Sequence, residues 1–104
     1  MFRVFTTEQF DKDYEKLDES EKKKVRKIRD QLKEKGDSVG KPLRRSYFRE
    51  KKFEGKRLYF LVYKEFMIVL GVGISGKKIQ QHTIDKIISD IKSYEKYIRK
   101  RLES

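Results

Sequence analysis

The chain has 104 residues with no cysteine and a single histidine, and its 28 Lys and Arg outnumber its 17 Asp and Glu, for a net charge of +11. Without cysteine it forms no disulfides and no thiolate zinc site, and one histidine excludes a multi-histidine metal centre. We therefore expect no metal, no cofactor and a cytoplasmic location. No apolar run reaches the roughly 18 residues of a membrane span. Seven Phe and six Tyr predict a folded chain, with residues 1–104 as a single domain.

The positive charge is concentrated in one short segment. Residues 41–57 carry eight basic and two acidic side chains, whereas residues 1–40 carry 11 and 10. A solvated helix face usually balances its charges, so a local excess indicates a polyanion or an acidic partner. Surface charge that serves only solubility is the alternative.

The first forty residues predict a strand followed by two helices. Residues 2–5 form a short apolar run that suits a strand. Thr6 with Gln9, and Asp18 with Glu21, have the spacing of capping boxes, in which two side chains satisfy free backbone N–H groups at a helix start. We expect an αα-hairpin over one face of a sheet, with the basic residues at 22–27 on its solvated side. The expected core positions are Phe10, Tyr14, Leu17, Val25, Ile28 and Leu32.

Residues 46–75 predict a three-stranded antiparallel meander. The strands are expected at Ser46–Phe53, Lys56–Tyr63 and Phe66–Ser75, with turns at 54–55 and 64–65. The side chains of a strand alternate between its two faces. We expect one face to pack on helices and the other, edged with Arg and Lys, to meet RNA. The core face is expected to comprise Leu58, Phe60, Val62, Ile68, Leu70, Val72 and Ile74.

Gly71 and Gly73 lie two residues apart in the last expected strand, which predicts a shallow strip for close packing, most simply of the C-terminal helix. From Thr83 onward, large apolar residues follow helical spacing for five turns and predict one long helix. This helix covers either the chain's own sheet or a second copy. Its apolar positions are Ile84, Ile87, Ile88, Ile91, Tyr94, Ile98 and Leu102.

The side chains available for chemistry are Arg, Lys, Tyr and one His, because the sequence has no phosphate-binding loop, no nucleophile elbow and no cysteine. These residues suit phosphate chemistry. RNA is cleaved without a metal when its 2'-OH attacks the adjacent phosphate and the protein stabilises the developing charge. Arg57 and Tyr59 share one strand face, and Tyr can stack on a base. His82 is a candidate for proton transfer or a plain surface residue.

Two segments, FREKKFEGKRLYFLVY and VGISGKKIQQHTI, together with the order of the elements, resemble the RelE/ParE superfamily of type II toxins. The resemblance spans nearly the whole chain. It implies an α+β fold of order β-α-α-β-β-β-α, with an antiparallel meander sheet, a two-helix hairpin and a long C-terminal helix. For RelE-like members it implies an mRNA interferase, a metal-independent and ribosome-dependent endoribonuclease that inhibits translation.

The resemblance also implies site residues. Arg57 matches the Arg that opens the middle strand, and Lys77 and Lys78 match the basic pair after the last strand. The basic positions of the preceding strand match Lys51 or Lys52. Together with the residues themselves, this gives Arg57, Lys52, Lys78 and His82 as the expected catalytic residues. The expected RNA-binding residues are Arg44, Arg45, Arg49, Lys51, Tyr59 and Lys77.

One position departs from the family. Its C-terminal aromatic falls near Ile84, which neither stacks as Tyr does nor exchanges a proton. This keeps two alternatives open: a ParE-like toxin that inhibits DNA gyrase without cleaving RNA, and a non-catalytic RNA-binding protein. The implied partners are mRNA, the ribosome and a cognate antitoxin, with no membrane, in a homodimer or a toxin–antitoxin heterotetramer. Arg57→Ala is expected to abolish cleavage and leave the fold intact.

Overall fold

The computed structural model describes residues 1–103 and has an α+β fold built on a five-stranded sheet. Among these residues no helix has the length and apolar character to span a membrane. The elements are β1 (Arg3–Thr6), α1 (Glu8–Glu15), α2 (Glu19–Lys35), η1 (Gly36–Ser38), β2 (Lys41–Pro42), β3 (Phe48–Phe53), β4 (Lys56–Tyr63), η2 (Lys64–Phe66), β5 (Ile68–Gly76), α3 (Gln80–Ser89) and α4 (Ile91–Glu103), where η marks a 3-10 helix.

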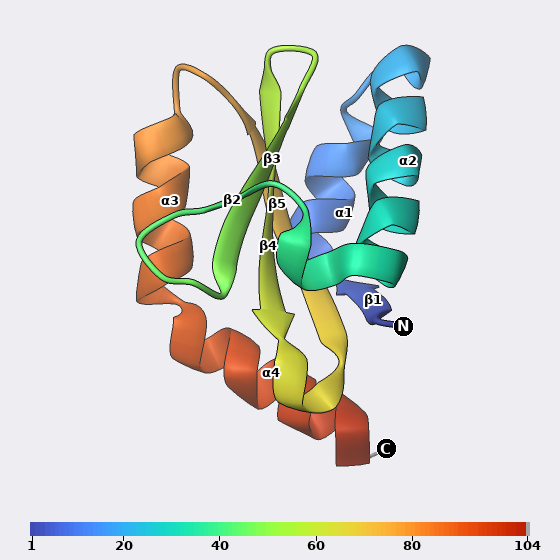
Figure 1. The fold of residues 1–104 in the computed structure, drawn as a ribbon. Coiled ribbons are helices and arrows are strands. Elements are labelled where there is room, and N and C mark those ends of the chain that lie inside the picture. Colours follow the sequence, from blue (N-terminus) through green and yellow to red (C-terminus); the bar gives the residue numbers. More distant parts are fainter. Residues whose placement is uncertain (104) are drawn as a thin grey trace.

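The predicted meander forms the centre of the sheet, whose strand order is β1-β5-β4-β3-β2 (Figure 1). β3, β4 and β5 pair antiparallel, as expected. β1 joins the far edge of β5 in parallel, and the short β2 pairs with Arg49 and Glu50 of β3. β4, in the middle, is therefore flanked by β5 along its whole length and by β3 from Lys56 to Leu61.

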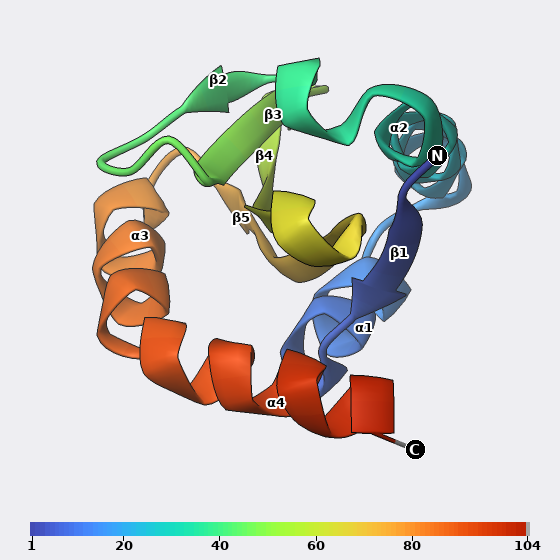
Figure 2. The same ribbon diagram turned by 60° about the horizontal axis from the view of Figure 1, so that its bottom comes forward.

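Helices cover both faces of the sheet. One core packs α1 and α2 against residues such as Leu58 and Phe60. A second core packs Ile84, Ile87 and Ile98 of α3 and α4 against the opposite face (Figure 2). The prediction that this second face is open to RNA is wrong, because the C-terminal isoleucine stripe buries itself there.

A bulge in β5 changes which side chains share a face. Tyr59 lies opposite Gly73 while Phe60 lies opposite Gly71, so Val72 is the extra residue between them. Val72 faces α3 and α4, and Ile74 belongs to the core under α1 and α2. The predicted set of core residues is therefore divided between the two faces. Leu58, Phe60, Val62 and Ile74 lie under α1 and α2, whereas Ile68, Leu70 and Val72 lie under α3 and α4. A Cβ on Gly71 would lie 2.9 Å from the ring of Phe10, so this glycine accommodates α1 and not the C-terminal helix.

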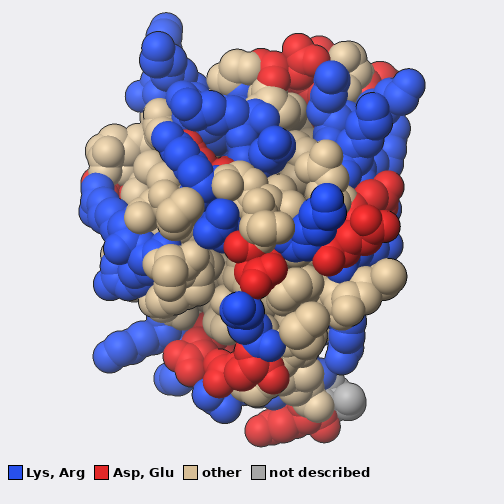
Figure 3. Space-filling view, viewed as in Figure 1, with Lys and Arg blue, Asp and Glu red and all other residues tan. Residues whose placement is uncertain are grey.

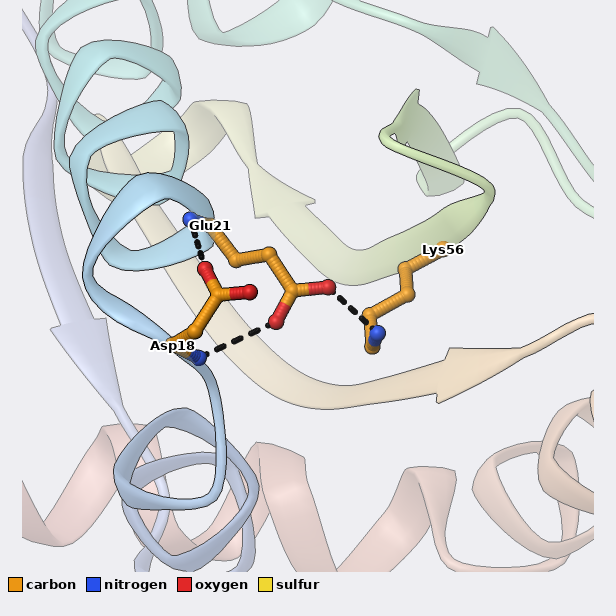
Figure 4. A network of polar contacts seen from close by, with 3 residues as sticks. All are labelled: Asp18, Glu21 and Lys56. Carbon is orange, nitrogen blue, oxygen red and sulfur yellow. Dashed lines mark hydrogen bonds and ion pairs between the residues drawn. The ribbon is translucent and has the colours of Figure 1, made fainter.

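The two helix starts differ in how well the sequence predicted them. α1 begins one residue later than expected, because Thr7 is its N-cap and accepts from the backbone N–H of Phe10 at 3.1 Å. The capping box of Asp18 and Glu21 is confirmed, with reciprocal bonds of 2.8 and 3.0 Å (Figure 4). Glu21 also pairs with Lys56 of β4, which ties α2 to the β3–β4 hairpin.

The predicted single C-terminal helix is wrong, because the chain turns between α3 and α4 at Asp90 (Figures 1 and 2). The side chain of Ser89 donates to the carbonyl of Lys86 at 2.7 Å, and Ser and Asp side chains compete for backbone groups in this way. On either side of the turn, Ile84 and Ile87 of α3 and Ile98 of α4 belong to the same core. Leu102, the last expected member of the stripe, is 38% exposed.

Candidate functional site

Three adjacent strands place polar residues side by side at the end of the sheet that holds the β3–β4 hairpin. Lys52 of β3 lies opposite Arg57 of β4, and Arg57 lies opposite Ser75 of β5. Lys77 and Lys78 follow β5 in the connection to α3, at the same end as the hairpin (Figure 1). The structure thus brings four of the expected cations to one end of the sheet.

Arg57 faces a buried carboxylate that sequence reasoning missed. Glu50 is 1% exposed, and its Oε1 lies 3.6 Å from Nε of Arg57, whose side chain is 11% exposed. Within residues 1–103, both carboxylate oxygens of Glu50 and the Nε of Arg57 lack a hydrogen-bond partner. The alternation of side chains along a strand could have identified Glu50 from the sequence. Glu50 lies two residues before Lys52, so it shares the face of β3 on which Lys52 lies opposite Arg57.

Tyr59 lies under this pair and cannot stack on a base. Its side chain is fully buried, its ring packs at 6.3 Å from that of Phe48, and its hydroxyl hydrogen-bonds with Ser75 Oγ at 2.9 Å. Burial raises the pKa of Tyr59, an effect that the Ser75 bond partly offsets. The prediction that Tyr59 binds RNA is therefore wrong for this fold; the residue instead supports the floor of the site.

The three expected RNA-binding arginines have different surroundings. Arg44 pairs with Asp85 of α3 at 3.0 Å, both side chains being about half exposed. Arg49 donates to the carbonyls of Val39 and Gly40 at 2.9 and 3.1 Å, so its guanidinium holds the segment before β2 in place. Arg45 is exposed. Of the three, Arg49 has a structural role that accounts for its position.

His82 is exposed near the start of α3 and lines a hollow between α1 and α3 together with Asp13 and Lys86. Arg57 is not among the residues that line this hollow, and the role of His82 stays a prediction. Ile84, at the expected aromatic position, is 6% exposed and packs into the core beneath α3. Residues 1–103 hold no group of three or more His, Cys, Asp or Glu side chains suited to a metal ion.

The surface around the hairpin is strongly basic. Lys and Arg side chains cover much of the molecule over the β3–β4 hairpin and the adjoining part of α2 (Figure 3). Lys51 is half-buried on the α2 side of β3, and Lys52 is exposed at its end. A protein surface of this kind attracts polyanions and accelerates their approach.

The element order and the two-sided helical cover define an α+β fold, which RelE toxins share. No family model and no curated protein matches the sequence. The isolated E. coli RelE toxin superposes with a TM-score of 0.67 at 17% identity, over 84% of this chain and 99% of that one.

Two toxin–antitoxin complexes contain similar chains. The intact E. coli RelBE complex gives a TM-score of 0.67 at 19% identity, covering 73% of this chain and 96% of that chain. The RelBE2 complex of Mycobacterium tuberculosis gives 0.65 at 23% identity, covering 73% and 98%. The resemblance stated from the sequence is confirmed at the level of the fold: this chain has the fold of RelE toxins.

Proposed function

We propose that this protein is the toxin of a type II toxin–antitoxin system and that it cleaves mRNA at the ribosome, which stops translation. The observation that carries the proposal is the row Lys52, Arg57 and Ser75 across three strands, on a fold that RelE toxins share. Lys77 and Lys78 add positive charge at the same end of the sheet.

The proposed reaction needs no group from outside the chain except the RNA and water. The 2'-oxygen of one nucleotide bonds to the adjacent phosphorus, the bond from phosphorus to the 5'-oxygen breaks, and a 2',3'-cyclic phosphate and a 5'-hydroxyl result. Water takes the proton of the 2'-hydroxyl, and Lys52 supplies one to the 5'-oxygen. Arg57 provides a planar fork for the phosphoryl oxygens, on which negative charge develops in the transition state.

The proposed partner is an antitoxin with an acidic or amphipathic segment. The E. coli and M. tuberculosis chains with this fold occur in toxin–antitoxin complexes. The net charge of +11 suits an acidic segment that wraps the toxin. We expect the assembly to be cytoplasmic and to be either a homodimer or a toxin–antitoxin heterotetramer.

Two observations favour a second candidate, a ParE-like inhibitor of DNA gyrase that does not cleave RNA. Glu50 supplies a negative charge directly beside Arg57, and the expected aromatic position is a buried isoleucine. Both features weaken the site for cleavage. Glu50 offsets part of the positive charge that Arg57 presents to a phosphate, and an isoleucine neither stacks on a base nor exchanges a proton. The same basic surface would then bind the target without chemistry.

Purified protein in a reconstituted translation reaction separates the two functions. The proposed nuclease cuts mRNA at positions that primer extension maps within codons, and Arg57→Lys lowers the cutting rate about a hundredfold or more. This variant keeps a positive charge opposite Glu50 and removes only the planar fork. Arg29→Lys, at an exposed position of α2, is the matched control and retains full cutting.

Intact mRNA at every protein concentration overturns the nuclease proposal. If the same preparation inhibits supercoiling by gyrase, the second candidate is correct. Equal cutting by the Arg57→Lys and Arg29→Lys variants removes Arg57 from the proposed catalytic site.

A further inference from the structure

A basic groove lies between α2 and the β3–β4 hairpin. Its walls include Lys24, Lys27 and Gln31 of α2 on one side and Lys51 and Lys52 of β3 on the other. The even mixture of charges along the first forty residues predicts that the lysines of α2 are only a solvated helix face. The folded chain instead sets them beside the most basic segment of the sequence.

Both walls follow from local structure. Lys24, Lys27 and Gln31 lie on one side of α2 because they are three and four residues apart, and Ile28, 4% exposed, anchors that side in the core. On β3, the short β2 pairs with Arg49 and Glu50. In the described part of the chain, the following edge, Lys51–Phe53, therefore has no further strand beside it.

The charges in the groove do not cancel. Four of its side chains are lysines, and the acidic one is Glu54, 3.8 Å from Lys24. Among the residues that the structure describes, Lys27, Lys51 and Lys52 have no acidic partner within 4.0 Å. Like charges that are held together repel each other, and an anionic ligand relieves that repulsion.

We propose that this groove binds the sugar–phosphate backbone of single-stranded RNA that flanks the phosphate held at Arg57. The inference rests on the proposed function and names its substrate contacts. Lys52 connects the two sites, because it lines the groove and is also paired in register with Arg57. The groove lies on the α2 face of the sheet and Arg57 on the other face, so in this proposal the RNA strand passes from one to the other over the exposed edge of β3 at Lys52. Lysines bind phosphates as point charges and carry no sequence information, so the groove adds affinity and orientation.

The test measures RNA binding separately from cleavage. A fluorescent, unstructured RNA oligonucleotide with 2'-O-methyl sugars at every position resists cutting, and its anisotropy is followed at several NaCl concentrations. Each lost phosphate contact lowers the slope of log affinity against log salt by about 0.7 for a single strand. Lys24→Gln/Lys27→Gln is therefore expected to lower the slope by about 1.4 and the affinity about tenfold, whatever the base sequence.

The matched control is Lys92→Gln/Lys96→Gln, which removes the same charge from exposed positions of α4. The proposal predicts that this control keeps the wild-type slope. Equal losses of salt slope in the two double variants would show that only net charge matters and would overturn the proposal that the groove binds RNA. An unchanged slope in the Lys24→Gln/Lys27→Gln variant would also overturn it.

Two further outcomes separate the groove from the nuclease. Groove-dependent binding without any cutting by the wild-type protein refutes the nuclease and supports the groove. If the wild-type protein cuts mRNA and the groove variant binds RNA normally, only the proposal that the groove binds RNA is refuted.

A poly-glutamate peptide is the second probe. If the groove variant no longer binds this peptide but still binds RNA, the groove binds an acidic protein segment and the RNA proposal fails.

Discussion

Glu50 and Arg57 form an ion pair inside the protein in which Oε1 and Nε are 3.6 Å apart and the side chains are 0% and 11% exposed. Within residues 1–103 neither carboxylate oxygen of Glu50 accepts a hydrogen bond. Breaking a buried pair by removing one partner typically costs about 3–5 kcal/mol, whereas replacing both partners costs much less. The sequence-based prediction that Arg57→Ala leaves the fold intact is therefore replaced by the expectation of a large loss of stability.

A double-mutant cycle checks this expectation. Arg57→Gln alone is expected to lower the free energy of unfolding by about 3 kcal/mol, because Glu50 stays buried without its ion-pair partner. Adding Glu50→Gln is expected to restore most of that loss. Urea unfolding at pH 7 of the wild type, both single variants and the double variant gives the coupling. Additivity within about 0.5 kcal/mol would mean that the two side chains do not interact.

Tyr59 and Tyr63 should respond to removal of their hydroxyls in opposite ways. The hydroxyl of Tyr63 is buried and, in the described part of the chain, has no hydrogen-bond partner, whereas that of Tyr59 bonds to Ser75. Tyr63→Phe is expected to stabilise the protein by about 1 kcal/mol, and Tyr59→Phe to destabilise it by about 1–2 kcal/mol. Thermal unfolding measures both. Shifts of equal sign in the two variants would contradict this assignment of hydrogen bonds.

Glu21 should stabilise the protein in a pH-dependent way. The hydrogen bond from Lys56, and after it the backbone N–H of Asp18, lower the pKa of Glu21 below its usual 4.5. Because the folded-state pKa is the lower one, the stabilisation is complete above about pH 4.5 and disappears as the pH falls through the folded-state value. Glu21→Gln is expected to lower the urea midpoint at pH 7 and to converge with the wild type in acid.

Glu19→Gln is the control for this measurement, since it removes an exposed carboxylate from the same helical turn. A smaller effect of Glu19→Gln isolates the two hydrogen bonds from the interaction with the helix dipole. If the two variants have the same pH profile, the contact with Lys56 contributes nothing.

Gly40 controls how closely the chain approaches Glu50. Its φ is +68°, and a Cβ there would lie 2.1 Å from the carbonyl oxygen of Glu50. Gly40→Ala is expected to cost more than about 2 kcal/mol, from the left-handed backbone and the clash together. Gly76→Ala, where a Cβ would meet no described atom within 4 Å, is the control. Similar urea midpoints for the two variants would show that the loop moves away from β3 without cost.

The parts of the fold that the sequence predicted correctly are those fixed by interactions between residues close together in the chain. β4 spans Lys56–Tyr63 as expected, because alternating apolar residues and the Glu54–Gly55 turn act over a few positions. The capping box of Asp18 and Glu21 is likewise a contact between neighbours in the chain. The basic segment from 41 to 57 is visible in the composition without any structure.

Contacts between distant segments were decided only by the tertiary structure. The burial of Tyr59 depends on α3 and α4 folding over the second face, and the two helices on either side of Asp90 both contribute side chains to the core there. By itself, the sequence determined the meander, the helical hairpin and the concentration of positive charge. The packed structure decided that Arg57 faces Glu50 and that Lys24 and Lys27 line the same groove as Lys51. The physical reason is that packing brings together residues that are far apart in the chain. The spacing of such residues follows neither the helical nor the strand repeat, so a sequence pattern does not reveal their contact.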